Sequence, residues 1–210
     1  MLPSLMLIIA VTLLYLLLIR ALDQHTQTGG LCLSLLWGGA SFALAYLVQN
    51  SLVNSQLLNI TGARLFSAPV LEELLKALPL LLLVSRSRAV YGFAIGLGFA
   101  LVESGVCISA NPDYALGTAL ARVISIHLIH GFTTALVGLI ASRKVPPKGF
   151  AAAVLIAMLI HAGFNLLAVS LEGKALVLAA AYAGVSSAAL LILLMSRRAH
   201  LLPAELTAAD

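Results

Sequence analysis

The chain has 210 residues, of which 61% are hydrophobic and only 10% are charged, and its mean hydropathy is +1.08. This composition excludes a soluble globular protein and predicts one all-α domain, residues 1–210, embedded in the lipid bilayer. The formal net charge is +4, but the Lys and Arg residues are few and lie at the ends of apolar segments, so no nucleic-acid partner is expected.

The apolar residues are gathered in segments of the length that crosses a bilayer, which is about 20 residues for a helix. We predict a polytopic bundle of about seven transmembrane helices, at about residues 2–20, 31–50, 66–84, 90–110, 116–141, 150–170 and 176–195. The first segment lacks a basic leading region and a small-residue cleavage site, so it is expected to be an uncleaved anchor. Residues 51–65 mix leucines with polar residues and are expected to form a loop or a short interfacial helix.

Positive charge is distributed unequally between the two sides of this topology. One side collects Arg20, Arg86, Arg88, Arg143, Lys144, Lys148, Arg197 and Arg198. The other side has Arg64 and Lys174, with Arg122 near it. By the positive-inside rule, the N-terminus is expected outside the cell membrane and the C-terminus in the cytoplasm.

The segment at 66–84 carries three charges in an otherwise apolar run, Glu72, Glu73 and Lys76. A charge near the bilayer centre costs roughly 3 kcal/mol, so charged residues there are expected to have partners and a function. On a helix, Lys76 lies one turn after both glutamates and can pair with either of them. One carboxylate is then left over, and it must be protonated, hydrogen-bonded or bound to a cation.

Polar residues with suitable chemistry recur in the next three apolar segments: Glu103, His127, His130, His161 and Asn165. At 1.5 Å per helical residue, Glu72 and Glu103 lie roughly 10 Å below the outer surface. His130 and His161 lie roughly 15 Å below it on the same count. The acids and imidazoles are therefore expected to meet at one level, toward the outer leaflet. His127 lies one turn from His130, and a place at this site and a hydrogen bond between helices explain it equally well.

Carboxylates and imidazoles gathered in a helical bundle are a ligand set that Zn2+ takes. A divalent cation would offset the surplus carboxylates, and an open coordination position would hold a water whose proton a glutamate can accept. Hydrolysis is the chemistry that this arrangement predicts. Lys76 is expected to balance the charge of the glutamates and to help position the helix. Asn165 is expected to orient a neighbouring side chain or to donate a hydrogen bond to the oxyanion.

Three familiar protease signatures are absent from the sequence. The histidines of His127-Leu128-Ile129-His130 have the wrong spacing for H-E-x-x-H and no glutamate between them. No G-x-G-D motif occurs, and no Asp lies within an apolar segment. Ser104-Gly105 lacks the preceding glycine of a rhomboid-like nucleophile.

Four short motifs follow one another on four successive segments. They are Glu72-Glu73-x-x-Lys76, Gly96-Leu97-Gly98-Phe99-x-x-x-Glu103, His130, and His161-x-x-x-Asn165. In this order, over about residues 66–170, they resemble the PrsW family of intramembrane metalloproteases. That family is itself similar to the CAAX-processing and bacteriocin-related membrane proteases, which have a histidine where this chain has Glu103.

The resemblance implies an intramembrane endopeptidase that cuts a single-span membrane protein on its extracytoplasmic side, as a site-one protease cuts an anti-sigma factor. It implies that either Glu72 or Glu73 is the general base that activates water, and that Asn165 supports the oxyanion. The residues that it places around a metal, for which Zn2+ is expected, or around the water itself, are Glu103, His130 and His161.

Two other functions are compatible with these residues. A non-catalytic scaffold would use the buried polar network to bind partner helices. An ion carrier would use the buried carboxylates for transport, although no repeat in matching halves supports a carrier. Among proteases, a glutamate and histidine site that activates water without permanent zinc is a further alternative. The sequence predicts no oligomeric state.

Overall fold

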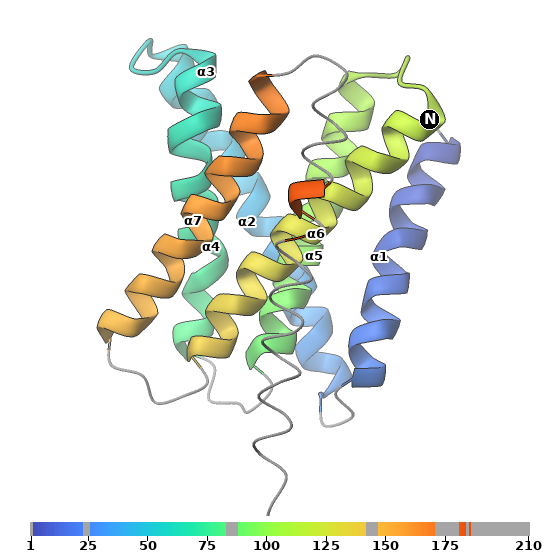
Figure 1. The fold of residues 1–210 in the computed structure, drawn as a ribbon, viewed down its shortest axis with the longest axis vertical. Helices are drawn as coiled ribbons and strands as arrows, with labels where there is room; N and C mark the ends of the chain where they lie inside the picture. Colours follow the sequence, from blue (N-terminus) through green and yellow to red (C-terminus); the bar gives the residue numbers. More distant parts are fainter. Residues whose placement is uncertain are drawn as a thin grey trace, which may run out of the picture.

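The computed structural model describes residues 2–22, 26–82, 88–141, 147–170, 181–183 and 185, and every regular element within them is a helix. In chain order these are α1 (Leu2–Leu22), α2 (Thr28–Asn54), α3 (Ile60–Gly62), a π-helical turn (Ala63–Ser67), α4 (Ala68–Leu82), α5 (Arg88–Ala110), α6 (Leu116–Ala141) and α7 (Pro147–Ser170) (Figure 1). The predicted all-α fold is confirmed for this part of the chain.

Four of the helices are long and apolar enough to cross a membrane: α2, α5, α6, and α7 over Lys148–Ala168. The chain is therefore a helical membrane protein. A shorter apolar run, Met6–Leu18, lies in α1, and α4 itself has 15 residues. The count of seven spans stays a prediction, because most of the expected span at 176–195 lies outside the described residues.

The connection between α2 and α4 differs from the loop or interfacial helix expected at 51–65. α2 continues to Asn54, and the next helical path begins at Ile60, before the expected start at 66. The side chain of Asn59 accepts a hydrogen bond from the backbone N–H of Gly62 at 2.6 Å and so caps this helix. The cap satisfies a donor that the first helical turn leaves free, which is why the helix begins there.

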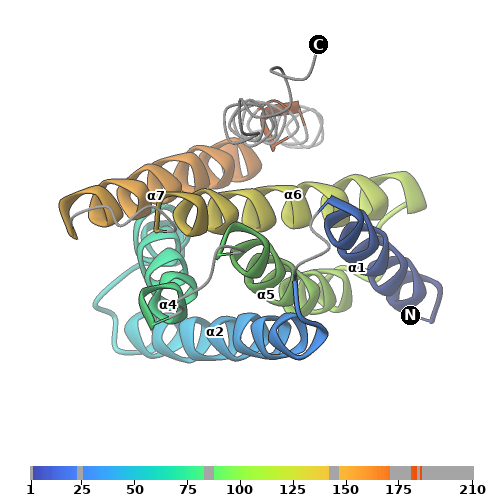
Figure 2. The ribbon, with the colours of Figure 1, turned by 90° about the horizontal axis from the view of Figure 1, so that it is seen from below.

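α5 is the centre of the bundle. Seen along the helices, α2 lies on one side of α5 and α6 on the other, with α1 and α4 at opposite ends of this arrangement (Figure 2). α7 lies beside α6 and also contacts α4. The N-terminus lies at the same end of the bundle as α3 and the turn between α5 and α6 (Figure 1). Four helices, α4 to α7, thus surround one interior region.

Glycines on two faces of α5 allow this close packing. Gly92 and Gly96 lie against α6, and a Cβ atom at Gly96 would collide with the backbone carbonyl of His130. On the opposite side, Gly98 lies against α2, where the backbone of α5 in turn approaches Gly38. Small residues permit helix backbones to approach each other closely in membranes. The glycine face toward α6 therefore sets the position of the helix that carries His130.

Gly96→Ala is expected to lower the free energy of unfolding by about 1–3 kcal/mol, because the added methyl group has to push α6 away from α5. Thermal unfolding of the purified protein in detergent measures this loss. Gly105→Ala is the matched control on the same helix, since a Cβ atom at Gly105 meets nothing within 4 Å. Equal stability of the two variants would contradict the close α5–α6 contact.

Candidate metal centre

α4 brings three charged side chains to one face of the bundle interior. Glu72, Glu73 and Lys76 lie within one helical turn, because residues three and four apart share a face of a helix. All three are buried, and Lys76 has no exposed surface. Charges enclosed in this way need partners within the protein.

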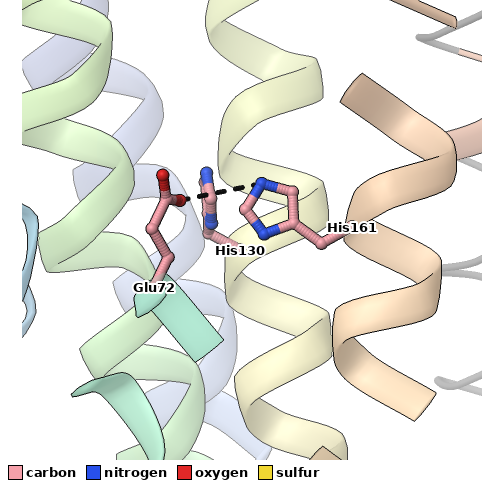
Figure 3. Close-up of side chains that lie close together, drawn as sticks. All are labelled: Glu72, His130 and His161. Atoms are coloured by element: carbon pink, nitrogen blue, oxygen red, sulfur yellow. Dashed lines mark ion pairs between the residues drawn. The ribbon is translucent and has the colours of Figure 1, made fainter. Parts of the chain in front are cut away.

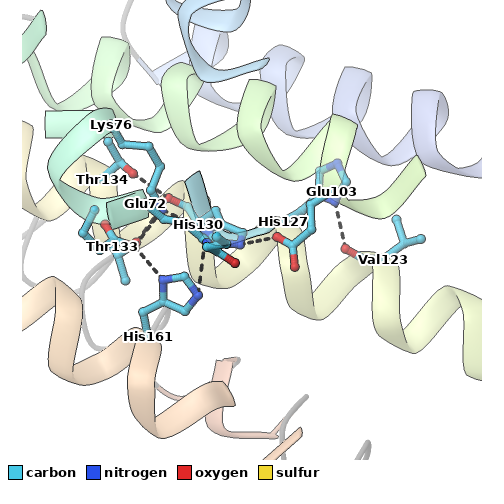
Figure 4. A network of polar contacts seen from close by, with 11 residues as sticks. Glu72, Lys76, Glu103, Val123, His127, His130, Thr133, Thr134 and His161 are labelled. Carbon is cyan, nitrogen blue, oxygen red and sulfur yellow. Dashed lines mark hydrogen bonds and ion pairs between the residues drawn. The ribbon is translucent and has the colours of Figure 1, made fainter. Parts of the chain in front are cut away.

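Lys76 makes two hydrogen bonds that fix the tautomer of His130. Its ammonium donates to Glu73 Oε1 at 2.6 Å and contacts His130 Nδ1 at 2.8 Å (Figure 4). Because an ammonium can only donate, Nδ1 of His130 is the acceptor, and the ring proton is on Nε2. That proton is donated to Glu103 Oε2, at 2.5 Å. The Lys76 ammonium also lies 4.8 Å from the ring centre of Phe99.

His161 on α7 joins both glutamates of α4. Its Nδ1 lies 3.0 Å from Glu73 Oε1, and its Nε2 lies 3.7 Å from Glu72 Oε2. A carboxylate can only accept, so Nδ1 carries the proton, and Nε2 of the neutral ring presents a lone pair toward Glu72. The other oxygen of Glu72 accepts a hydrogen bond from Gln49 Nε2 at 3.2 Å. Two electron-rich atoms thus face each other at a distance that suits a shared cation.

Glu72, His130 and His161 form a group whose ligand atoms lie within 4.8 Å of one another (Figure 3). Ligands of tetrahedral zinc at bond lengths of about 2.1 Å are about 3.4 Å apart, so a small convergence of these side chains reaches that spacing. A carboxylate lies behind each imidazole, Glu103 at His130 and Glu73 at His161. Metal-ligating histidines usually have such a partner, so the donor set fits a divalent cation that takes the place of the Lys76 ammonium at Nδ1 of His130.

The charges of the cluster also favour a cation. Three carboxylates, those of Glu72, Glu73 and Glu103, are balanced by one ammonium, that of Lys76, at direct contact distance. When all three carboxyl groups are ionised and the imidazoles are neutral, two negative charges are in excess. A buried excess of this size is stabilised by a divalent ion.

The two oxygens of Glu73 have different surroundings. Oε1 receives the hydrogen bonds of Lys76 and His161 and lies 3.3 Å from the hydroxyl of Thr133. Oε2 is buried and has no hydrogen-bond partner among the described residues. Glu73 is thus held firmly through one oxygen, while the other is free to accept a proton.

Exposure indicates from which side the cluster can be reached. His130 and His161 are 1% and 2% exposed, whereas the side chain of Glu103 is 28% exposed. The cluster is therefore open on the side of Glu103 and closed by protein around the imidazoles.

His127 points away from this cluster. Its Nδ1 contacts the carbonyl oxygen of Val123 at 2.8 Å (Figure 4). Its Nε2 contacts Thr12 Oγ1 on α1 at 2.8 Å. The ring of Tyr15 stacks on it with centroids 6.4 Å apart. Of the two interpretations of His127, the structure supports the contact between helices, which here joins α1 to α6.

The expectation that acids and imidazoles of four helices meet at one level is confirmed by these contacts. Glu103, expected around the metal or the water, contacts the ring nitrogen of His130, and the Glu72, His130 and His161 group does not include it. Its ligation of a metal stays a prediction. Asn165 is partly buried and lies one turn after His161 on α7. Its support of the oxyanion stays a prediction.

Two residues that hold the glutamates of α4 in place were not predicted from the sequence, Gln49 and Thr133. Both are polar residues within apolar segments, the signal that singled out the histidines. Their side chains are neutral and cost less to bury than a charge, so their presence in an apolar segment is a weaker sign of a functional site.

The fold and this cluster together define a class, a polytopic helical membrane protein with a buried carboxylate and imidazole centre suited to a metal. The family model of the PrsW family intramembrane metalloproteases matches residues 27–196. The chain therefore belongs to the PrsW family and is an intramembrane protease. No curated protein and no solved structure matches it.

Proposed function

We propose that this protease hydrolyses a peptide bond in or near the transmembrane segment of a single-span membrane protein, using Zn2+ held by Glu72, His130 and His161. The observation that carries the proposal is the convergence of these three side chains from three helices, with their ligand atoms within 4.8 Å. The excess of carboxylates around them supports a divalent ion rather than a neutral hydrogen-bonded cluster.

Each residue then has a chemical task. Zinc, when bound, supplies the Lewis acidity that makes a water acidic near neutral pH and polarises the scissile carbonyl. Glu73 accepts the proton of the water through its free Oε2 and later donates it to the leaving amine. Lys76 and Thr133 hold the other oxygen of Glu73 in place. Asn165 donates a hydrogen bond to the oxyanion.

This assignment exchanges two of the roles expected from the sequence. Glu103 accepts the Nε2 proton of His130, and we assign it the orientation of that imidazole instead of direct metal ligation. Glu72 faces Nε2 of His161 at 3.7 Å and takes the place of Glu103 among the ligands. Glu73 is then the general base of the two adjacent glutamates.

The position of the centre suggests where the substrate is cut. Glu103 lies seven residues before Ala110, the end of α5, which is about 10 Å of helix. In the orientation proposed from the positive charges, this end of the bundle faces outside and the C-terminus is cytoplasmic. A substrate helix that approaches on the side of Glu103 would be cut in its outer half. A regulator of the anti-sigma-factor kind, with one span, fits this geometry.

Reconstitution with a panel of single-span substrates tests the proposal. The expected result is cleavage that a chelator abolishes and Zn2+ restores, with product termini, identified by mass spectrometry, in the outer half of the span. Products cut in the cytoplasmic half would contradict the proposed leaflet. Absence of product from every substrate at every zinc concentration would contradict proteolysis by this centre.

A further inference from the structure

α4 contains a proline at a place where the helix carries chemistry. Pro79 lies within α4 and has no N–H, so the carbonyl of Leu75, four residues earlier, has no helical donor. Leu75 lies between Glu73 and Lys76. The missing hydrogen bond therefore falls in the turn that contains Lys76 and directly follows the two glutamates.

The indole of Trp37 replaces the missing donor. Its Nε1–H donates to the carbonyl oxygen of Leu75 at 3.0 Å, from α2 to α4. The ring is partly buried and packs on an apolar cluster that includes Ala77, Leu80 and Ile95. The indole thus reaches the carbonyl from a fixed position, because the cluster around its ring limits its rotation.

α2 contacts α4 through polar side chains at a second point. Gln49 donates to Glu72 Oε1 at 3.2 Å, and it lies twelve residues after Trp37, about 18 Å along α2. The contact of Gln49 fixes the side chain of Glu72, a proposed ligand. The contact of Trp37 fixes the backbone carbonyl of Leu75, the residue before Lys76. α2 therefore contacts the charged turn of the proline-containing α4 at two points.

We propose that Trp37 is a positioning residue of the protease, whose indole N–H replaces the helical hydrogen bond that Pro79 removes and thereby fixes Glu72, Glu73 and Lys76. The inference rests on the proposed function, since the fixed residues are those of the proposed metal centre. A purely space-filling role for Trp37 makes a different prediction, because the effect of Trp37→Phe would then be the same whichever residue stands at position 79.

Pro79→Ala separates the two roles. The alanine N–H can donate to the carbonyl of Leu75 within α4, so the helix no longer needs the indole. Trp37→Phe is expected to lower kcat about tenfold with little change in KM, since a misplacement of under 1 Å has effects of this order. In the Pro79→Ala background the same substitution is expected to cost less than threefold. An equal loss in both backgrounds overturns the proposal.

Leu78→Ala is the matched control for the proline change. Leu78 is an exposed neighbour on α4, 48% accessible, and its substitution supplies no new N–H. In this background Trp37→Phe should still cost about tenfold. Rescue by Leu78→Ala as well would overturn the proposal, because it would show a general effect of altering α4.

Two readouts are independent of proteolysis. Trp37 is the single tryptophan of the chain, so its indole gives one NMR signal, expected downfield as for a hydrogen-bonded N–H. Zinc affinity of the wild type and the variants is expected to follow the same pattern of loss and rescue. If no substrate is cut, the proposed function fails, while the affinities still decide the inference. An indole shift typical of a free N–H overturns it.

Discussion

Glu73→Gln is expected to lower kcat for cleavage of a single-span substrate by roughly a thousandfold, the effect of losing a general base. The amide keeps the size of the side chain, but its nitrogen and oxygen cannot accept the proton of the attacking water. Steady-state cleavage in liposomes measures the loss. Asp113→Asn, the same chemical change in the exposed turn between α5 and α6, is expected to leave the rate unchanged.

Glu73→Gln also leaves the ammonium of Lys76 without its carboxylate partner, which is 2.6 Å away in the wild type. Removing one partner of a buried pair costs about 3–5 kcal/mol, so loss of folding could imitate loss of catalysis. The double variant Glu73→Gln, Lys76→Met removes both charges and is expected to unfold near the wild-type temperature while being inactive. Full activity in this folded double variant would refute the role of Glu73.

The sequence carries much of the information about this site because burial of charge in a membrane is costly. Glu72, Glu73 and Glu103 lie in apolar segments where each needs a partner, so their convergence with the histidines could be predicted. The count along each helix predicts which residues share a level because every residue of a helix advances by the same 1.5 Å. Such arguments give the level of a side chain and leave its rotamer open.

The side-chain rotamers and the hydrogen-bond partners at the site could not be predicted from the sequence. His127 and His130 are three residues apart, and only contacts show that His127 turns to Thr12 while His130 turns to Lys76 and Glu103. Residues three apart share a face of a helix, so their spacing does not show which of the two histidines points into the site. The same holds for the choice between Glu72 and Glu103 as ligand.

The early start of the third helical path has a local cause in the sequence, whereas the support of α4 by α2 depends on a distant residue. Asn59 has the chemistry of a helix cap, but a hydrophobicity window centred on 66–84 places the helix start later. Pro79 signals a free carbonyl at Leu75, but not which distant side chain reaches it. Trp37, 38 residues earlier in the chain, can be identified only from the packed structure.

The second large effect expected is on metal binding. The wild-type protein is expected to bind about one Zn2+ per chain, and His161→Gln to weaken that binding at least about 100-fold, more than loss of an orienting partner usually does. His130→Gln is expected to act in the same way. His127→Gln is the matched control on α6, because His127 contacts Thr12 and Val123 away from the group. Equilibrium competition with a zinc-sensitive dye measures all four affinities.

Lys76→Met is expected to change zinc affinity in the opposite direction. Lys76 contacts Nδ1 of His130 at 2.8 Å and thus competes with a cation for that nitrogen, and its removal also raises the negative charge around the group. Both effects favour zinc, and a charge at this distance is enough for tightening of about tenfold or more. Weaker binding in Lys76→Met would mean that Lys76 supports the cation's ligands rather than competing with it. Equal zinc affinity of the wild type and His161→Gln would contradict the proposed ligand set, and Glu73 and His161 would then activate water without a metal.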